Sequence, residues 1–186
     1  MARTVSIGAQ GFDRLREENL FLIDKTAFIK EWWENYDDVT LITRPRRFGK
    51  TLNMSMLECF FSVKYKDRED LFEGLSVWED EAYRIIQGTY PVINMTFSSV
   101  KSGTISEIQD DIHEKIRVLF EENRFLADEG FLSEGEQEYF KNITLGTGNP
   151  LLKNALQRLC GFLSRYYGTS YVTTNSVAIQ LLKRIS

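Results

Sequence analysis

The sequence predicts an α/β fold in which helices cover a mainly parallel β-sheet. Two continuous apolar runs, at residues 39–43 and 91–97, are typical of strands that are covered on both faces. Helical patterns alternate with these runs over 25–35, 52–61 and 105–120, where apolar residues recur at three- and four-residue steps. Because strands that alternate with helices favour crossover connections, we expect the strands to pair in parallel.

Local signals place further elements along the chain. A short strand is expected at residues 20–23, and Asp24 can cap the helix that follows it. Thr104 and Glu107 have the spacing of a capping box at the start of the longest helix. A later helix is expected to begin at Asn149-Pro150 and to end at Gly168.

Length and composition narrow the class of protein. The 186 residues, of which 42% are hydrophobic, are enough for one domain with a sizeable core. Cys59 and Cys160 both lie in apolar helical patterns, so we expect buried free thiols in a reducing compartment. No apolar run approaches the roughly 20 residues of a membrane-spanning helix, and no signal peptide is evident. These features predict a cytoplasmic protein with no membrane partner.

The most informative motif lies between the first long apolar run and the helix that follows it. Gly49-Lys50-Thr51 matches the end of the phosphate-binding pattern G-x-x-x-x-G-K-[ST], in the required strand–helix context. Gly49 would let the backbone approach a phosphate, Lys50 would reach the β and γ phosphates, and Thr51 would bind Mg²⁺. Arg44 stands where the pattern has its first glycine, and Arg44-Pro45 favours an extended backbone there.

We therefore predict a site for a nucleoside triphosphate and Mg²⁺ in one continuous segment. The segment from Thr43 to Thr51 carries four cations and no acid. Thr51 is the predicted metal ligand, and no catalytic residue can be assigned. A basic surface loop with a chance Gly-Lys-Thr is the simpler alternative. The predicted binding residues are Arg44, Pro45, Arg46, Arg47, Phe48, Gly49, Lys50, Thr51 and Leu52.

This segment, from Ile42 to Leu57, resembles the signature of the AAA-ATPase-like family of bacterial P-loop proteins, which typically have an arginine-rich loop without the first glycine. Residues 21–26, 71–75 and 91–97 also resemble segments of that family, and the resemblance covers roughly residues 6–168. It implies a P-loop NTPase fold, a three-layer α/β sandwich, with ATP as the ligand. Family members often continue into a nuclease-like domain of the PD-(D/E)XK type, which we do not find in these residues.

The end of the chain departs from the family pattern. The family would place here an apolar strand that ends in acids, the Walker B element, but residues 169–186 contain no acid. We interpret residues 1–186 as one domain, incomplete at its C-terminus, with an atypical tail over 169–186 and a short helix over 177–185. A fragment of a longer chain, a shifted reading frame and a true variant are the alternative explanations. Without these acids we expect slow hydrolysis.

Three functions remain open on the sequence alone. The first is an ATP-binding module derived from an ATPase. The second is a nucleic-acid-binding or nuclease-associated module, in which Arg44, Arg46 and Arg47 contact a sugar–phosphate backbone, although the net charge of −4 argues mildly against it. The third is a structural or interaction domain with a relic P-loop. Apolar sheet edges left by missing strands would favour a homo-oligomer.

Overall fold

The computed structural model divides into two compact units. Unit 1 comprises residues 1–94 and 170–186, and unit 2 comprises residues 95–169. For the strands at 39–40, 172–175 and 179–181 the structure describes the backbone alone. The residues that the structure describes are 4, 8–35, 39–40, 49–96, 103–128, 130–147, 154–168, 172–175 and 179–181.

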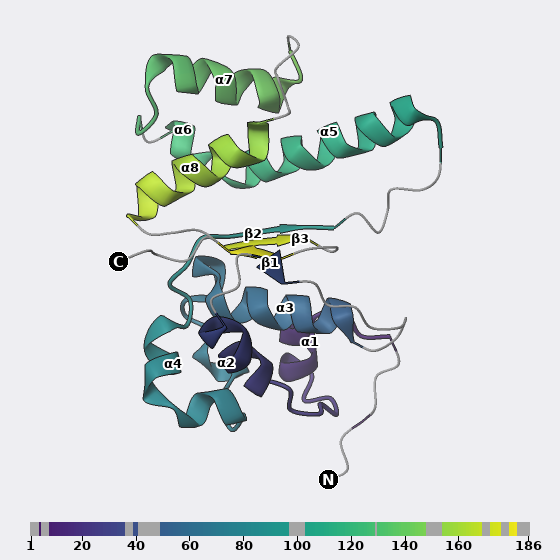
Figure 1. The fold of residues 1–186 in the computed structure, drawn as a ribbon, viewed down its shortest axis with the longest axis vertical. Coiled ribbons are helices and arrows are strands. Elements are labelled where there is room, and N and C mark those ends of the chain that lie inside the picture. The colour runs from purple at the N-terminus through teal and green to yellow at the C-terminus, as the bar shows by residue number, and fades with distance from the viewer. Residues whose placement is uncertain are drawn as a thin grey trace. The chain divides into compact units, whose positions relative to one another are not determined.

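Unit 1 combines short helices, 3₁₀ turns and strands (Figure 1). Its α-helices are α1 (Phe12–Glu17), α2 (Ala27–Glu34), α3 (Lys50–Phe61) and α4 (Glu81–Ile86). The 3₁₀ turns are η1 (Val63–Tyr65), η2 (Glu69–Leu71) and η3 (Ser76–Glu79). The strands are β1 (Val39–Thr40), β2 (Val92–Met95), whose last residue begins unit 2, β3 (Val172–Asn175) and β4 (Ile179–Leu181).

The expected α/β sandwich with a mainly parallel sheet is wrong. Among the residues whose side chains are described, 66% are helical and 4% are in strands. β2 is the one strand of the four whose side chains are described. The strand order is β1-β4-β3-β2, and β4 pairs antiparallel with both β1 and β3. Only residues 176–178 separate β3 from β4, which is too short for the crossover connection that parallel strands need.

Two further predictions in unit 1 are also wrong. Residues 20–23 form no strand: Phe21 and Ile23 are exposed, and Leu22 packs against the aromatic core instead of a sheet. The helix expected over 177–185 is replaced at 179–181 by β4, whose backbone pairs on both sides. The strand expected at 91–97 is confirmed as β2, and the one expected at 39–43 is described only as β1.

The helices predicted over 25–35, 52–61 and 105–120 are confirmed, although the N-cap of α2 is Thr26 and not the predicted Asp24. α2 lies within the expected 25–35, and α3 begins two residues before the expected 52–61. At the start of α5 (Ile105–Glu122), the Thr104 amide donates to Glu107 Oε2 (2.6 Å), and the Glu107 amide donates to Thr104 Oγ1 (3.3 Å), as in a capping box. α8 (Ala155–Tyr167) ends at Gly168, which has a left-handed backbone (φ 62°). Its expected start at Asn149-Pro150 lies outside the described residues.

The core of unit 1 is built from aromatic rings that surround α3. The Phe61 ring has its centroid 5.2 Å from the Trp32 and Trp33 rings of α2 and 4.9 Å from the Phe60 ring. Phe60 in turn meets Phe72 edge to face, at 5.1 Å. Aromatic pairs in these arrangements stabilise a core beyond the apolar area that they bury. The C-terminal half of α3 is therefore held on several sides.

Unit 2 contains four α-helices among its described residues: α5, α6 (Phe125–Asp128), α7 (Glu134–Leu145) and α8. α5 packs against α7 and α8, and α6 packs against α8. The apolar stripe predicted along α5 is buried only in its second half, where Ile116, Leu119 and Phe120 lie inside. Ile105, at the beginning of the same stripe, is 79% exposed.

Both cysteines are buried free thiols, as expected from their patterns. Burial raises the pKa of Cys59 and of Cys160 to about 12, so neither thiol is ionised near neutral pH. Within the described part of the chain, no helix combines the length and apolar character needed to cross a membrane.

The packing around Phe61 predicts a large effect of its truncation. Phe61→Ala should lower the free energy of unfolding by about 3–5 kcal/mol, because loss of this fully buried ring leaves a cavity against four other rings. Urea denaturation followed by tryptophan fluorescence measures the change. Ile85→Ala on α4, where the side chain is 69% exposed, is the control and should stay within about 0.5 kcal/mol. Equal effects of the two substitutions would contradict the packing described here.

Candidate functional site

The candidate site is the N-terminus of α3, which begins directly after Gly49. Gly49 is the N-cap residue and has a left-handed backbone (φ 74°, ψ 21°), a conformation that favours glycine. The Asn53 amide donates to the Gly49 carbonyl (2.9 Å), so the helical hydrogen bonds begin there. The amides of residues 50–52 precede this first bond and belong to the free end of the helix.

The first turn of α3 lacks the groups that usually stabilise a helix start. Gly49 offers no side-chain cap, and no acid lies in the first turn. α5 and α7 have glutamates there, whereas α2 and α8, like α3, have neither a side-chain cap bond nor an acid in the first turn. Lys50 and Thr51 are both exposed at this end of the helix. A cation near a helix N-terminus opposes the partial positive charge of the helix, so this arrangement suits a bound anion better than an empty site.

The predicted site residues are only partly described. Gly49, Lys50 and Thr51 lie together at the start of α3, whereas Leu52 is half-buried and packs against the aromatic core. The other five, Arg44, Pro45, Arg46, Arg47 and Phe48, lie outside the described residues. The nucleic-acid alternative depends on these arginines and stays a prediction.

The body of α3 holds this site in place. Met56, Leu57, Phe60 and Phe61 are buried along the helix. The Phe12 amide, at the start of α1, donates to Ser55 Oγ of α3 (3.0 Å). Because one face of the helix is fixed by these contacts, its first turn has a defined position at the surface of unit 1.

A second segment, residues 24–26, is hydrogen-bonded to the start of η3. Asp24 Oδ1 accepts from the Thr26 amide (2.8 Å) and from the Thr26 hydroxyl (2.7 Å), and Asp24 Oδ2 accepts from the Ser76 amide (2.8 Å). Thr26 Oγ1 also accepts from the Val77 amide (3.1 Å). We call these bonds the Asp24–Thr26 clamp.

The clamp also controls the charge of Asp24. Partial burial alone would raise the pKa of this carboxyl, but the hydrogen bonds from Thr26 and Ser76 outweigh it and hold the pKa below its ordinary value. Asp24 is therefore a charged structural acceptor. Since both of its oxygens are engaged, it is poorly placed to replace the missing acid of a Walker B element.

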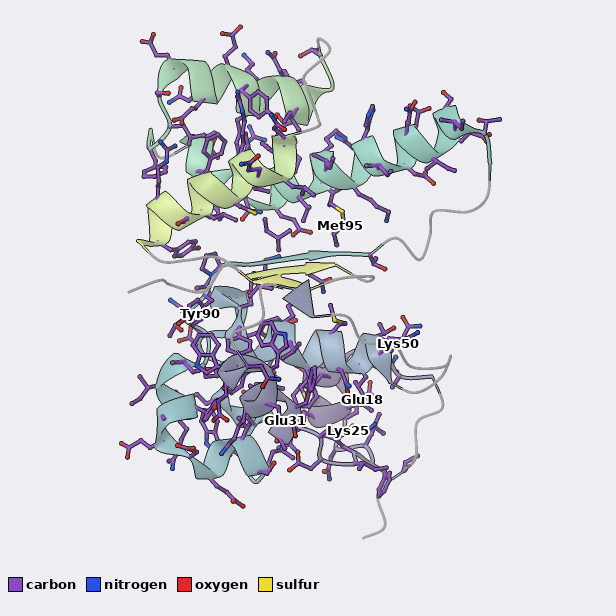
Figure 2. All side chains as sticks on the ribbon, viewed as in Figure 1. Glu18, Lys25, Glu31, Lys50, Tyr90 and Met95 are labelled. Atoms are coloured by element: carbon purple, nitrogen blue, oxygen red, sulfur yellow. The ribbon has the colours of Figure 1, made fainter. Side chains whose placement is uncertain are left out.

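Lys25, between the two clamp residues, reaches the candidate site. A Cβ atom built on Gly49 would lie 3.8 Å from Lys25 Nζ, which is the one described atom within 4 Å of it outside Gly49 and its neighbours along the chain. Figure 2 shows Lys25 and Lys50 at the end of unit 1 where α3 begins. Lys25 was not among the predicted site residues. Its segment, residues 21–26, resembles a segment of the family, but nothing in the sequence indicates that Lys25 approaches Gly49.

Other chemistry finds little support in the described part of the chain. His113, the single histidine, is exposed on α5. The described residues contain no group of three or more histidine, cysteine, aspartate or glutamate side chains that could hold a metal ion. The arrangement at α3 is suited to binding an anion, and a metal ion there would depend on oxygens that the anion brings.

Comparisons with known proteins point to one family. The AAA-ATPase-like family, described as a predicted AAA-ATPase, matches residues 6–151. A curated relative from Azotobacter chroococcum mcd 1, the "Uncharacterized protein in vnfD 5'region", is 33% identical over 111 residues. That alignment covers 58% of this chain but 19% of the relative, so the chain spans about a fifth of the length of this curated relative. No solved structure gives a significant match.

The clamp predicts a pH-dependent role for Asp24. Asp24→Asn should lower the free energy of unfolding at pH 7 by about 1–2 kcal/mol, because an amide supplies one oxygen where the carboxylate supplies two. The depressed pKa means that the carboxylate stabilises the fold above its unfolded pKa of about 3.9 and loses this effect as pH falls through the lower folded value. The difference between wild type and variant should therefore shrink below about pH 4.

Urea denaturation at pH 7 and pH 3 tests this expectation. Asp67→Asn, at an exposed carboxylate in unit 1, is the matched control and should differ little from wild type at pH 7. A penalty for Asp24→Asn that is as large at pH 3 as at pH 7 would show that the charge of Asp24 does not act as described.

The left-handed backbone of Gly49 makes a separate prediction. Gly49→Ala should cost about 1 kcal/mol of stability, because a Cβ atom is strained at this φ although the space around it is open. Gly161→Ala, inside α8 with nothing within 4 Å of the new Cβ, should instead gain about 0.5–1 kcal/mol. Thermal unfolding of both variants measures the contrast, and a gain at both positions would argue against a left-handed Gly49.

Proposed function

We propose, for a chain that belongs to the AAA-ATPase-like family, that unit 1 binds ATP together with Mg²⁺ at the N-terminus of α3. The observation that carries the proposal is the start of this helix. A left-handed glycine without a capping side chain precedes exposed Lys50 and Thr51, and no acid lies in the first turn. The sequence Gly-Lys-Thr at a helix start is the end of the phosphate-binding pattern.

Each part of this helix start has a role toward a triphosphate. The amides of residues 50–52, at the free end of the helix, can donate to phosphate oxygens. The helix adds a partial positive charge of about half a unit at the same place. The Lys50 ammonium supplies a full charge for the β and γ phosphates, and Gly49 keeps side-chain atoms out of their way.

Mg²⁺ fits this site as a partner of the phosphates. Thr51 offers one hydroxyl oxygen at the first turn, and Mg²⁺ prefers oxygen ligands while keeping several of its waters. When bound, the ion would neutralise part of the negative charge of the phosphates. Asp24, which precedes Lys25, is committed to the clamp.

We propose tight binding with slow hydrolysis for these residues. Residues 169–186 contain no acid to hold the metal or to orient water, and Asp24 is engaged with Thr26 and Ser76. A phosphate-binding loop needs its amides and lysine for affinity but needs further groups for turnover. We place this binding activity in the cytoplasm, in keeping with the two free thiols.

Removal of the Lys50 charge should weaken nucleotide binding. Lys50→Ala should bind a fluorescent ATP analogue in the presence of Mg²⁺ at least about tenfold more weakly than wild type, because it loses a charge-assisted contact to phosphate. Fluorescence anisotropy measures the affinity. Lys141→Ala, at an exposed lysine of α7 in unit 2, is the control and should bind like wild type.

A thermal measurement gives a second readout. Millimolar Mg-ATP should raise the melting temperature of wild type, because a ligand that binds only the folded state stabilises it by mass action. Millimolar Mg-ATP should raise the melting temperature of Lys50→Ala much less. Equal affinity of wild type and Lys50→Ala, or no thermal response in wild type, would contradict the proposal and favour a structural domain.

A further inference from the structure

We infer that Lys25 is a second phosphate-contacting residue of the nucleotide site, carried to the start of α3 by the Asp24–Thr26 clamp. This inference rests on the proposed function of the site. Its direct observation is the approach of Lys25 Nζ to within 3.8 Å of the position that a Cβ atom on Gly49 would occupy. Lys25 comes from the loop before α2, so it is independent of the Gly-Lys-Thr pattern in sequence.

The clamp explains how a side chain on a loop obtains a defined position. Thr26 is 1% exposed and bonds to Asp24, Ser76 and the Val77 amide, so the backbone on that side of Lys25 is fixed. Asp24, on the other side, is tied to the Ser76 amide. The backbone carbonyl of Lys25 accepts from the Phe28 amide (3.0 Å). Lys25 itself is exposed and extends from this anchored segment toward Gly49.

The electrostatics favour a role in binding over a role in folding. Within the described residues the Lys25 ammonium has no hydrogen bond or ion pair. Glu18, which Figure 2 shows in the same part of unit 1, pairs instead with Arg14 (2.8 Å). The ammonium thus lies beside a helix N-terminus that carries partial positive charge and has no acid in its first turn. Without an anion this placement is mildly unfavourable, and a bound phosphate makes it favourable.

The chemistry of lysine indicates which part of the ligand it contacts. An ammonium is a compact charge on a flexible stem, which suits phosphate oxygens at the open side of a loop. Together, Lys25 and Lys50 would provide two positive charges from separate segments of unit 1. Because Lys25 acts on the phosphates, it should strengthen binding of Mg-ATP and of inorganic triphosphate alike. It should leave the preference between adenine and guanine nucleotides unchanged.

The test compares four forms of the full chain: wild type, Lys25→Gln, Lys25→Arg and Lys141→Gln. We expect Lys25→Gln to weaken binding of both Mg-ATP and inorganic triphosphate by about tenfold, as for the loss of one charge-assisted contact. The affinity of this variant should also depend less steeply on salt concentration, because one charge has been removed. Lys25→Arg should keep most of the affinity, and Lys141→Gln should behave as wild type.

The melting temperature without ligand separates binding from folding. For Lys25→Gln it should equal or slightly exceed that of wild type, because the variant removes a cation from the positive end of α3. Two results together would overturn the inference and show a structural role for Lys25. They are a melting temperature of Lys25→Gln below that of wild type, and a loss of ligand affinity in Lys25→Arg as large as in Lys25→Gln.

The remaining outcomes distinguish this inference from the proposed function. If Lys50→Ala loses affinity while Lys25→Gln binds like wild type, Lys25 is no phosphate contact and the ATP-binding proposal stands. If wild type and Lys50→Ala bind equally, or if wild type binds neither Mg-ATP nor inorganic triphosphate, the proposed function fails and the inference about Lys25 fails with it.

Discussion

The packing of α3 into an aromatic core is the constraint on which the rest of unit 1 depends. Phe60 and Phe61 are fully buried at the C-terminal end of this helix, against rings from α2 and from the segment that contains Phe72. When a helix is packed along one face, the positions of both of its ends are also fixed. Its first turn is therefore held at the surface without any capping side chain.

Stability and binding make opposite demands at this helix start. A helix that had only to be stable would begin with a capping side chain and an acid, as α5 does with Thr104 and Glu107. α3 begins instead with a left-handed glycine and Lys50, and Lys25 adds a second cation nearby. The core around Phe61 offsets this unfavourable start. Unfavourable groups gathered at one place and supported from elsewhere are typical of functional sites.

The Asp24–Thr26 clamp links two parts of unit 1 that are far apart in the sequence. Asp24 and Ser76 are 52 residues apart, yet their bond sets the path of the loop before α2. The same bonds engage both oxygens of Asp24, which leaves this acid a structural role. The short segment Asp24-Lys25-Thr26 thus has two roles. Asp24 and Thr26 fix the backbone, and Lys25 between them extends toward Gly49.

The sequence by itself determined the helices α2, α3, α5 and the end of α8, the phosphate-binding pattern at Gly49-Lys50-Thr51 and the burial of both cysteines, because periodicity, capping residues and glycine act within a few residues of each other. It did not determine the sheet: alternating elements predicted parallel strands, whereas β4 pairs antiparallel with β1 and β3. Nor did it determine the place of Lys25. Strand partners and the approach of Lys25 to Gly49 depend on contacts between distant segments, and only the tertiary structure decides which of these form.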